Sequence, residues 1–291
     1  MNSTFLLLML PGTLFLGVED FLKKKYLNNG MSEQVLLSTT FFLAGFLLMP
    51  ILFIGGIPTI EPQFWNAFVG TVILNVVAQN LFIRAYKYNE ASIIAPLRLI
   101  TPILVIFTGF IVLREVPSFI GTIGIFTTLV GLYMLLYGKI ASWGITNLKN
   151  NGLILGFLAC LLFAFSFVLD KQAVVSSSAL FMSSLVFMSI GLLTGVINLI
   201  VSPTFLLKTK ETILLNWRSL LLISVLISIG AFLTNQSLNY TLTAYASSIK
   251  RLQVLWTVIL AGIFLHESQI GRRTLAVVVM FFGVALTIWA G

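Results

Sequence analysis

Ten long apolar runs are the feature that most constrains the fold of this 291-residue chain. A helix needs about 20 mostly apolar residues, each rising about 1.5 Å, to cross about 30 Å of hydrocarbon. The runs are continuous and do not alternate in polarity, so they predict membrane-spanning helices and not a β-barrel. Their approximate limits are 4–22, 33–55, 64–86, 91–113, 117–138, 152–170, 179–201, 219–239, 245–265 and 271–290.

The composition agrees with an all-α polytopic membrane protein. Hydrophobic residues make up 58% of the chain and charged residues 9%, against about 25% charged residues in soluble domains. The formal net charge of +8 lies mostly in short gaps between the runs, which favours a role in membrane orientation over nucleic-acid binding. The N-terminal run lacks a positive leader and a small-residue cleavage site, so we expect it to be the first span and not a signal peptide.

The sequence contains an internal repeat. Residues 88–116, YNEASIIAPLRLITPILVIFTGFIVLREV, align with residues 240–268, YTLTAYASSIKRLQVLWTVILAGIFLHES, at a constant offset of 152. Each half then has five spans, and because five is odd the second half enters the membrane from the opposite side. We therefore predict ten transmembrane helices as two inverted five-helix repeats, residues 1–138 and 152–291, joined by residues 139–151.

The two aligned segments resemble the drug/metabolite transporter superfamily, EamA type. Its hallmark is a helix that ends in a glutamate, then a short turn, then a helix with a Gly-Leu or Gly-Val pair. Here these residues are Glu115 with Gly131-Leu132, and Glu267 with Gly283-Val284. The resemblance implies a permease of the cell (inner) membrane, a monomer or a homodimer, that carries a small metabolite or a drug. It also implies that spans 1, 3, 4, 6, 8 and 9 line a central cavity and that spans 5 and 10 pack outside or against the partner half.

Three cations lie inside the fourth and ninth runs: Arg98, Lys250 and Arg251. A cation at the bilayer centre costs at least about 2.5 kcal/mol. The offset aligns Arg98 with Lys250, and inverted-repeat transporters hold substrate near the midplane between the repeats. One interpretation is therefore a site for a phosphate or carboxylate, in which arginine provides a bidentate fork. The alternative is snorkelling to the interface, or pairing with acidic residues of the first and sixth runs.

Those acidic residues are Glu19, Asp20 and Asp170. Carboxylates within spans often serve as proton or cation relays, which makes the three candidates for coupling. The alternative is local neutralisation, because lysines follow each of these positions in the sequence, at residues 23–25 and at Lys171.

Uncharged polar side chains recur in the third and eighth runs and near the cations. Amides inside a span either hydrogen-bond a neighbouring helix or line a wet cavity, and helix–helix bonds of this type average about 0.6 kcal/mol. We expect cavity lining and substrate contacts from the amides and from two aligned tyrosines, and either a cavity cap or a lipid contact from one tryptophan. These candidates are Gln79, Asn80, Asn235, Asn239, Tyr88, Tyr240 and Trp256.

The aligned glutamates Glu115 and Glu267 have a structural interpretation. Each precedes a new helix, where a carboxylate stabilises the positive N-terminal end. His266 has no second histidine or cysteine nearby in the sequence, so no metal site is expected. No phosphate-binding loop motif occurs, and no cofactor is expected.

Two criteria disagree about orientation. Twelve lysines and arginines lie in gaps that follow odd-numbered spans, against four on the other side. The positive-inside rule therefore places those gaps in the cytoplasm and both termini outside. The resemblance implies the reverse, with both termini cytoplasmic.

These features together predict a secondary transporter of a small polar, anionic metabolite that works by alternating access. Its partners would be the lipid bilayer, the substrate, and a proton or an exchanged solute. The alternative is an exporter of organic cations, drugs or amino acids that uses the acidic residues of spans 1 and 6. The sequence shows no constellation of nucleophile and base for membrane catalysis, which argues against an enzyme.

Overall fold

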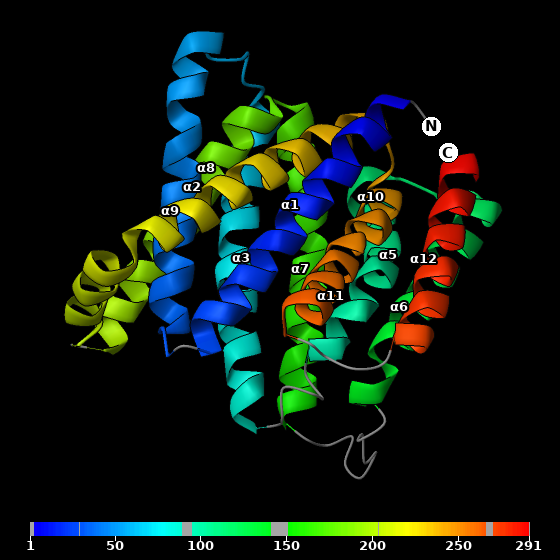
Figure 1. Cartoon of the computed structure of the whole chain (residues 1–291). Coiled ribbons are helices and arrows are strands. Elements are labelled where there is room, and N and C mark those ends of the chain that lie inside the picture. Colours follow the sequence, from blue (N-terminus) through cyan, green and yellow to red (C-terminus); the bar gives the residue numbers. More distant parts are fainter. Residues whose placement is uncertain are drawn as a thin grey trace.

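A computed structural model describes residues 3–28, 30–88, 95–140, 151–202, 204–265 and 270–290 (Figure 1). This part of the chain is helical and contains no β-strand, in agreement with the predicted all-α class. The first half contains α1 (Ser3–Asn28), α2 (Glu33–Gly55), α3 (Pro62–Tyr88), the 3-10 helix η1 (Ala95–Ile100), α5 (Thr101–Leu113) and α6 (Phe119–Ile140). The second half contains α7 (Asn151–Val175), α8 (Ala179–Val201), α9 (Phe205–Ser237), the 3-10 helix η2 (Leu238–Tyr240), α10 (Thr243–Lys250), α11 (Leu252–Leu265) and α12 (Ile270–Ala290).

Six of these helices, α1, α2, α3, α7, α8 and α9, are long and apolar enough to cross a bilayer. Three shorter apolar segments lie at Leu97–Leu113, Phe119–Met134 and Leu275–Ala290. Helix occupies most of each predicted run, although the fourth and ninth runs are each divided between a short helix and a longer one. The chain is thus a multi-pass membrane protein, and the count of ten crossings stays a prediction.

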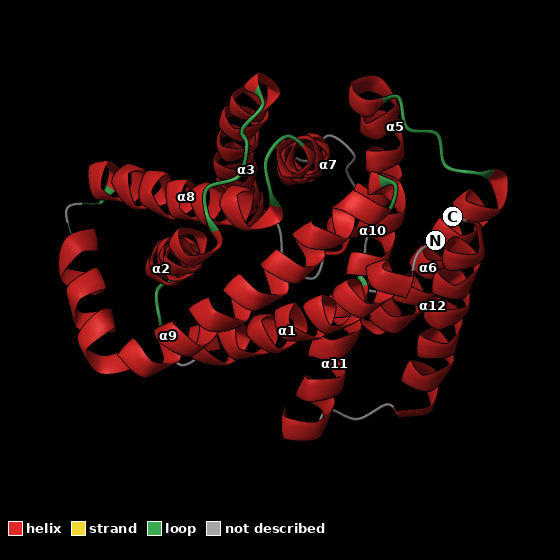
Figure 2. Cartoon of the chain, turned by 90° about the horizontal axis from the view of Figure 1, so that it is seen from above, coloured by secondary structure: helices red, strands yellow, loops and turns green. Residues whose placement is uncertain are grey.

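The helix contacts follow a two-fold pattern. Helix α3 packs along α7, and α1 packs along α9 in the same way. The contact of α1 with α11 has a counterpart in the contact of α7 with α5. Two pairs contact their own counterparts directly: α2 with α8, and α6 with α12, the latter at one edge of the molecule (Figures 1 and 2).

Glycines show how closely α2 and α8 approach. A Cβ added at Gly45 would lie 2.5 Å from the Ser184 carbonyl oxygen, and one added at Gly191 would lie 2.7 Å from the Ser38 carbonyl oxygen. The two contacts are images of each other, because both pairs of equivalent residues are 146 positions apart. The contacts run in opposite directions along the two helices, so α2 and α8 are antiparallel, as an inverted repeat requires.

The same relation holds between α6 and α12, at an offset of 152 residues. A Cβ added at Gly131 would lie 2.9 Å from the Ala276 carbonyl oxygen, and one added at Gly283 would lie 2.8 Å from the Gly124 carbonyl oxygen. The glycines of the aligned motif therefore allow two helix backbones to touch, where any larger side chain would push them apart.

One helix differs clearly from the expectation. The eighth span was predicted over residues 219–239, but α9 begins at Phe205 and contains a kink at Asn216 (φ −129°, ψ 20°). The segment before the kink carries Lys208, Lys210 and Glu211, and its charges make it look like a gap between spans. It is nevertheless helical, because its apolar and charged residues are good helix formers.

Candidate functional site

Two helix breaks position the three cations, of which Arg98 is exposed and Lys250 and Arg251 are partly buried. Arg98 lies in η1, just before α5, and Lys250 is the last residue of α10. Arg251 occupies the turn between α10 and α11. The turn is tight: the Arg251 N–H donates to the Ser248 carbonyl (3.1 Å) and the Val254 N–H donates to the Arg251 carbonyl (3.0 Å). Interrupted helices at equivalent places in two repeats are typical of substrate sites in secondary transporters.

The structure brings these cations together with two of the three candidate coupling acids. Arg251 interacts electrostatically with Arg98 and Asp20. Lys250 interacts electrostatically with Asp170, Arg251 and Asp20. None of the three cations forms an ion pair with a carboxylate in the described part of the chain, and the Arg251 Nε atom is buried without a hydrogen-bond partner. The candidate site thus contains three basic side chains and two acidic ones.

Aromatic rings, which sequence reasoning missed, support two of the cations. The Arg98 guanidinium carbon lies 4.6 Å from the ring centroid of Phe82 and 5.9 Å from that of Phe163. The Lys250 Nζ atom lies 5.2 Å from the ring centroid of Phe167. The chain has 25 phenylalanines, and an apolar run does not reveal which of them face a cation.

Asp170 belongs to a polar network between α3 and α7. Its carboxylate accepts a hydrogen bond from the Thr71 hydroxyl. The Thr71 and Ser166 hydroxyl oxygens are 2.6 Å apart, and the Asn75 amide donates to Ser166. Thr71 and Ser166 carried no signal in the sequence, because isolated hydroxyl residues in spans commonly bond to their own helix.

The two acids of α1 lie in different surroundings. Asp20 accepts a hydrogen bond from the Gln253 amide of α11 (2.7 Å), on the side of the cations. Glu19 is buried and forms an ion pair with Lys23, whose Nζ atom also lies 4.9 Å from the ring centroid of Phe41. Glu19 is thus paired within its own helix.

The candidate amides divide between packing and open positions. Asn235 is buried and donates to the Ser183 hydroxyl of α8 (2.9 Å), which is the helix–helix alternative. Asn80 donates to the Val76 carbonyl of its own helix (2.8 Å). The Oε1 atom of Gln79 is buried without a partner among the described residues. Asn239 is exposed and donates to the Gln236 carbonyl (3.4 Å).

Among the described residues, none of the aromatic candidates has a cation at its ring. Tyr88 is 60% exposed and Tyr240 is 38% exposed, each at an end of its helix. The indole N–H of Trp256 donates to the Thr13 hydroxyl (3.3 Å), a contact between α11 and α1. The backbone of α1 approaches the same place, because a Cβ at Gly17 would lie 2.7 Å from the Gln253 carbonyl oxygen.

Glu115 stabilises a helix start, but not that of the following helix. Its carboxylate accepts a hydrogen bond from the Thr243 backbone N–H (2.7 Å), the first residue of α10 in the other half. It also forms an ion pair with Lys171, and Lys171 donates to the Thr241 carbonyl (2.6 Å). The expectation that Glu115 stabilises the helix after it is therefore wrong. The aligned Glu267, like His266, lies outside the described residues.

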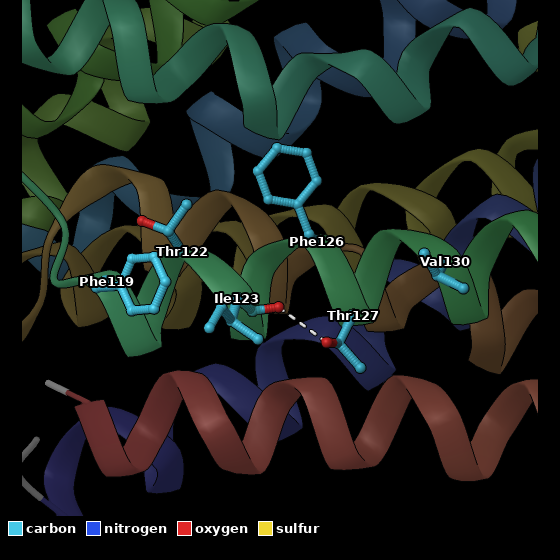
Figure 3. A pocket seen from close by; sticks show the side chains of 6 residues that line it. All are labelled: Phe119, Thr122, Ile123, Phe126, Thr127 and Val130. Atoms are coloured by element: carbon cyan, nitrogen blue, oxygen red, sulfur yellow. Dashed lines mark hydrogen bonds between the residues drawn. The ribbon is translucent and has the colours of Figure 1, made fainter.

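A separate apolar hollow of about 440 Å³ lies on α6, lined by Phe119, Thr122, Ile123, Phe126, Thr127 and Val130 (Figure 3). Phe119 is 81% exposed and Val130 is 53% exposed. The only hydrogen bond drawn there joins the Thr127 hydroxyl to the Ile123 carbonyl of the same helix. None of the side chains that line the hollow is charged.

Comparisons with known proteins agree with this geometry. Residues 3–137 and 150–289 match the sequence model of the EamA-like transporter family. No match is found among curated protein sequences. A solved structure described only as "Crystal structure of protein" superposes with a TM-score of 0.80, over 100% of this chain and 98% of that chain, at 11% sequence identity. At that identity the likeness shows the fold alone.

Proposed function

Because the chain belongs to the EamA-like transporter family, we propose that it is a secondary transporter of a small, polar, anionic metabolite in the inner cell membrane. Ten crossings form two inverted five-helix halves, and the halves rock about a central site to expose it to one side at a time. The antiparallel contacts of α2 with α8 and of α6 with α12 support this arrangement.

One observation carries the anionic substrate: Arg98, Lys250 and Arg251 converge from both halves without an ion pair in the described part of the chain. Like charges in a half-dry site repel one another, and an anion that enters between them relieves the repulsion. An arginine offers a planar fork of N–H donors for a carboxylate or phosphate, and a lysine adds a mobile point charge.

A second candidate function rests on the acids of the same site. Asp20 and Asp170 both interact electrostatically with Lys250, so an organic cation could replace Lys250 as their partner. In that case the protein is an exporter of organic cations, drugs or amino acids, and the arginines serve only to balance the acids.

A ligand screen followed by a transport assay distinguishes the two candidate functions. Purified protein is heated with separate sets of carboxylates, organic phosphates, amino acids and organic cations, since a ligand that binds only the native state raises the melting temperature. The compounds that stabilise it are then tested for uptake into proteoliposomes.

We expect anions to stabilise the protein, and we expect Arg98→Gln and Lys250→Gln to abolish their uptake while the protein still folds. If Lys250→Gln and Arg251→Gln both transport at the wild-type rate, the anion site is refuted. The organic-cation function then leads, with Asp20→Asn and Asp170→Asn as its tests.

A further inference from the structure

Three phenylalanines lie against the cations of the candidate site in a regular order. Phe163 and Phe167 are one turn apart on α7, with Phe163 beside Arg98 (5.9 Å) and Phe167 beside Lys250 (5.2 Å). Phe82 of α3 lies closer to Arg98 (4.6 Å) and is fully buried. The rings of Phe82 and Phe163 are 6.0 Å apart at an interplanar angle of 43°. A single helix turn thus sets the separation of two cations that belong to opposite halves.

A phenyl ring and a carboxylate stabilise a neighbouring cation in different ways. The face of a phenyl ring attracts a cation by about 0.5–2 kcal/mol, more when water is excluded. It does so without accepting N–H hydrogen bonds in the way a carboxylate does. Within the described ranges, no residue accepts a hydrogen bond from the side chain of Arg98 or of Lys250. The donors of both cations therefore stay available for an incoming oxyanion.

We propose that Phe82, Phe163 and Phe167 are positioning residues that form an aromatic platform for Arg98 and Lys250. The platform holds both cations in the empty site, presents their N–H donors to a carboxylate or phosphate, and so selects anions over cations. This proposal rests on the proposed anion transport, and it names residues outside the polar set that the sequence pointed to.

Leucine and tyrosine substitutions test the platform in the full-length protein. Phe82→Leu and Phe167→Leu keep an apolar side chain and remove the ring, whereas Phe167→Tyr keeps the ring. Phe68→Leu is the matched control, since Phe68 lies on α3 and stacks on Phe64 at 5.8 Å, with no cation at its ring among the described residues. The probes are inorganic phosphate and succinate, and the readout is the apparent Kd from melting temperature against anion concentration.

We expect Phe82→Leu and Phe167→Leu to raise the apparent Kd about five- to tenfold, the equivalent of one lost cation–π contact. Phe167→Tyr should bind as tightly as wild type, and Phe68→Leu should leave the Kd unchanged. In proteoliposomes the leucine variants should raise KM and leave the maximal rate near wild type. Equal losses in Phe68→Leu, or no rescue by tyrosine, show a general packing effect and overturn the platform.

A second measurement needs no ligand. Phe82→Leu, Arg98→Gln and the double variant are unfolded in the absence of added anion. The platform predicts that the two changes are strongly non-additive, because each removes the same contact; additive effects overturn it. If Arg98→Gln and Lys250→Gln abolish anion binding while both leucine variants bind normally, the platform fails and the anion site stands. If all these variants bind as wild type does, or if wild type binds neither probe, both proposals fail.

Discussion

At the scale of single residues, Asp170 has an unusual choice of partners. It interacts electrostatically with Lys250, yet its carboxylate accepts its hydrogen bond from the neutral hydroxyl of Thr71. It therefore weakens the positive field at the site without occupying the lysine. A carboxylate in this position would tune anion affinity downward, which helps a transporter to release its substrate.

Asp170→Asn tests that role with a change of charge and almost none of shape. We expect the apparent Kd for the transported anion to fall about tenfold, or about 1.4 kcal/mol, because one repulsive charge is lost. Thr71→Ser, which keeps the hydroxyl, should bind as wild type does. The measurement is the anion titration of melting temperature, and a complete loss of transport in Asp170→Asn would favour the organic-cation function instead.

At the residue scale, the sequence draws attention to the charges in the apolar runs but not to the side chains that surround them. Arg98 and Lys250 stand out because a cation in an apolar run is costly, and the structure places both of them within one electrostatic cluster with Arg251. Phe82 and Phe167 do not stand out, because a phenylalanine has the same hydropathy whether it faces lipid or a guanidinium. Their role depends on the packing of α3 and α7, which no local pattern records.

At the scale of helices, the α2–α8 contact supplies a test with an internal control. A Cβ at Gly191 would lie 2.7 Å from the Ser38 carbonyl oxygen, whereas one at Gly195 would lie 3.9 Å from the Ser38 Cβ atom, an ordinary contact. Gly191→Ala should therefore destabilise the protein by about 1–3 kcal/mol, the usual cost of overpacking. Gly195→Ala should be neutral or slightly stabilising, since alanine favours helix. Melting temperatures in detergent compare the two, and equal effects would contradict the close approach of α2 and α8.

The contact between Glu115 and the other half gives a second helix-scale prediction. Glu115 and Lys171 are both mostly buried, with side-chain exposures of 12% and 15%, and Glu115 also accepts the N–H at the start of α10. Glu115→Gln and Lys171→Met should each lower the free energy of unfolding, with a coupling of about 1–2 kcal/mol in the double variant. The exposed Glu33, in the first turn of α2, is the control, and Glu33→Gln should change little. Strict additivity would show that the pair does not stabilise the protein.

At the helix scale, the sequence predicted the helix ranges that depend on hydropathy. It did not predict which helices contact each other in space. The ranges of α2 and α8 agree with runs 33–55 and 179–201, because both runs are continuous and have breakers at their ends. The partner of Glu115 was wrong, because a carboxylate after a helix is close in sequence to one helix start and close in space to another. Only the tertiary contact between α5 and α10 reveals which start it reaches.

At the scale of the whole molecule, the repeat has consequences that the apolar runs alone do not have. The offset of 152 residues aligns Gly131 with Gly283, and these glycines make equivalent contacts between α6 and α12. The sequence could indicate this symmetry because the two halves can be aligned with each other residue by residue. It could not indicate which helices of the two halves touch, and the pairing of α1 with α9 and of α3 with α7 came only from the structure.

The last prediction concerns the orientation of the whole molecule in the membrane. The count of lysines and arginines places both termini outside, whereas the family resemblance implies cytoplasmic termini. Both chain ends lie at the same end of the molecule (Figure 1), and so does the link between α2 and α3, because successive helices alternate in direction. The positive-inside rule places the opposite end in the cytoplasm.

In a Cys160→Ser background, Ile57→Cys, at a position 68% exposed, should react with a membrane-impermeant maleimide added outside intact cells. Asn29→Cys and Asn150→Cys, which lie outside the described residues, should react only after permeabilisation. The reverse pattern would establish cytoplasmic termini and show that the charge bias of this chain does not decide its topology.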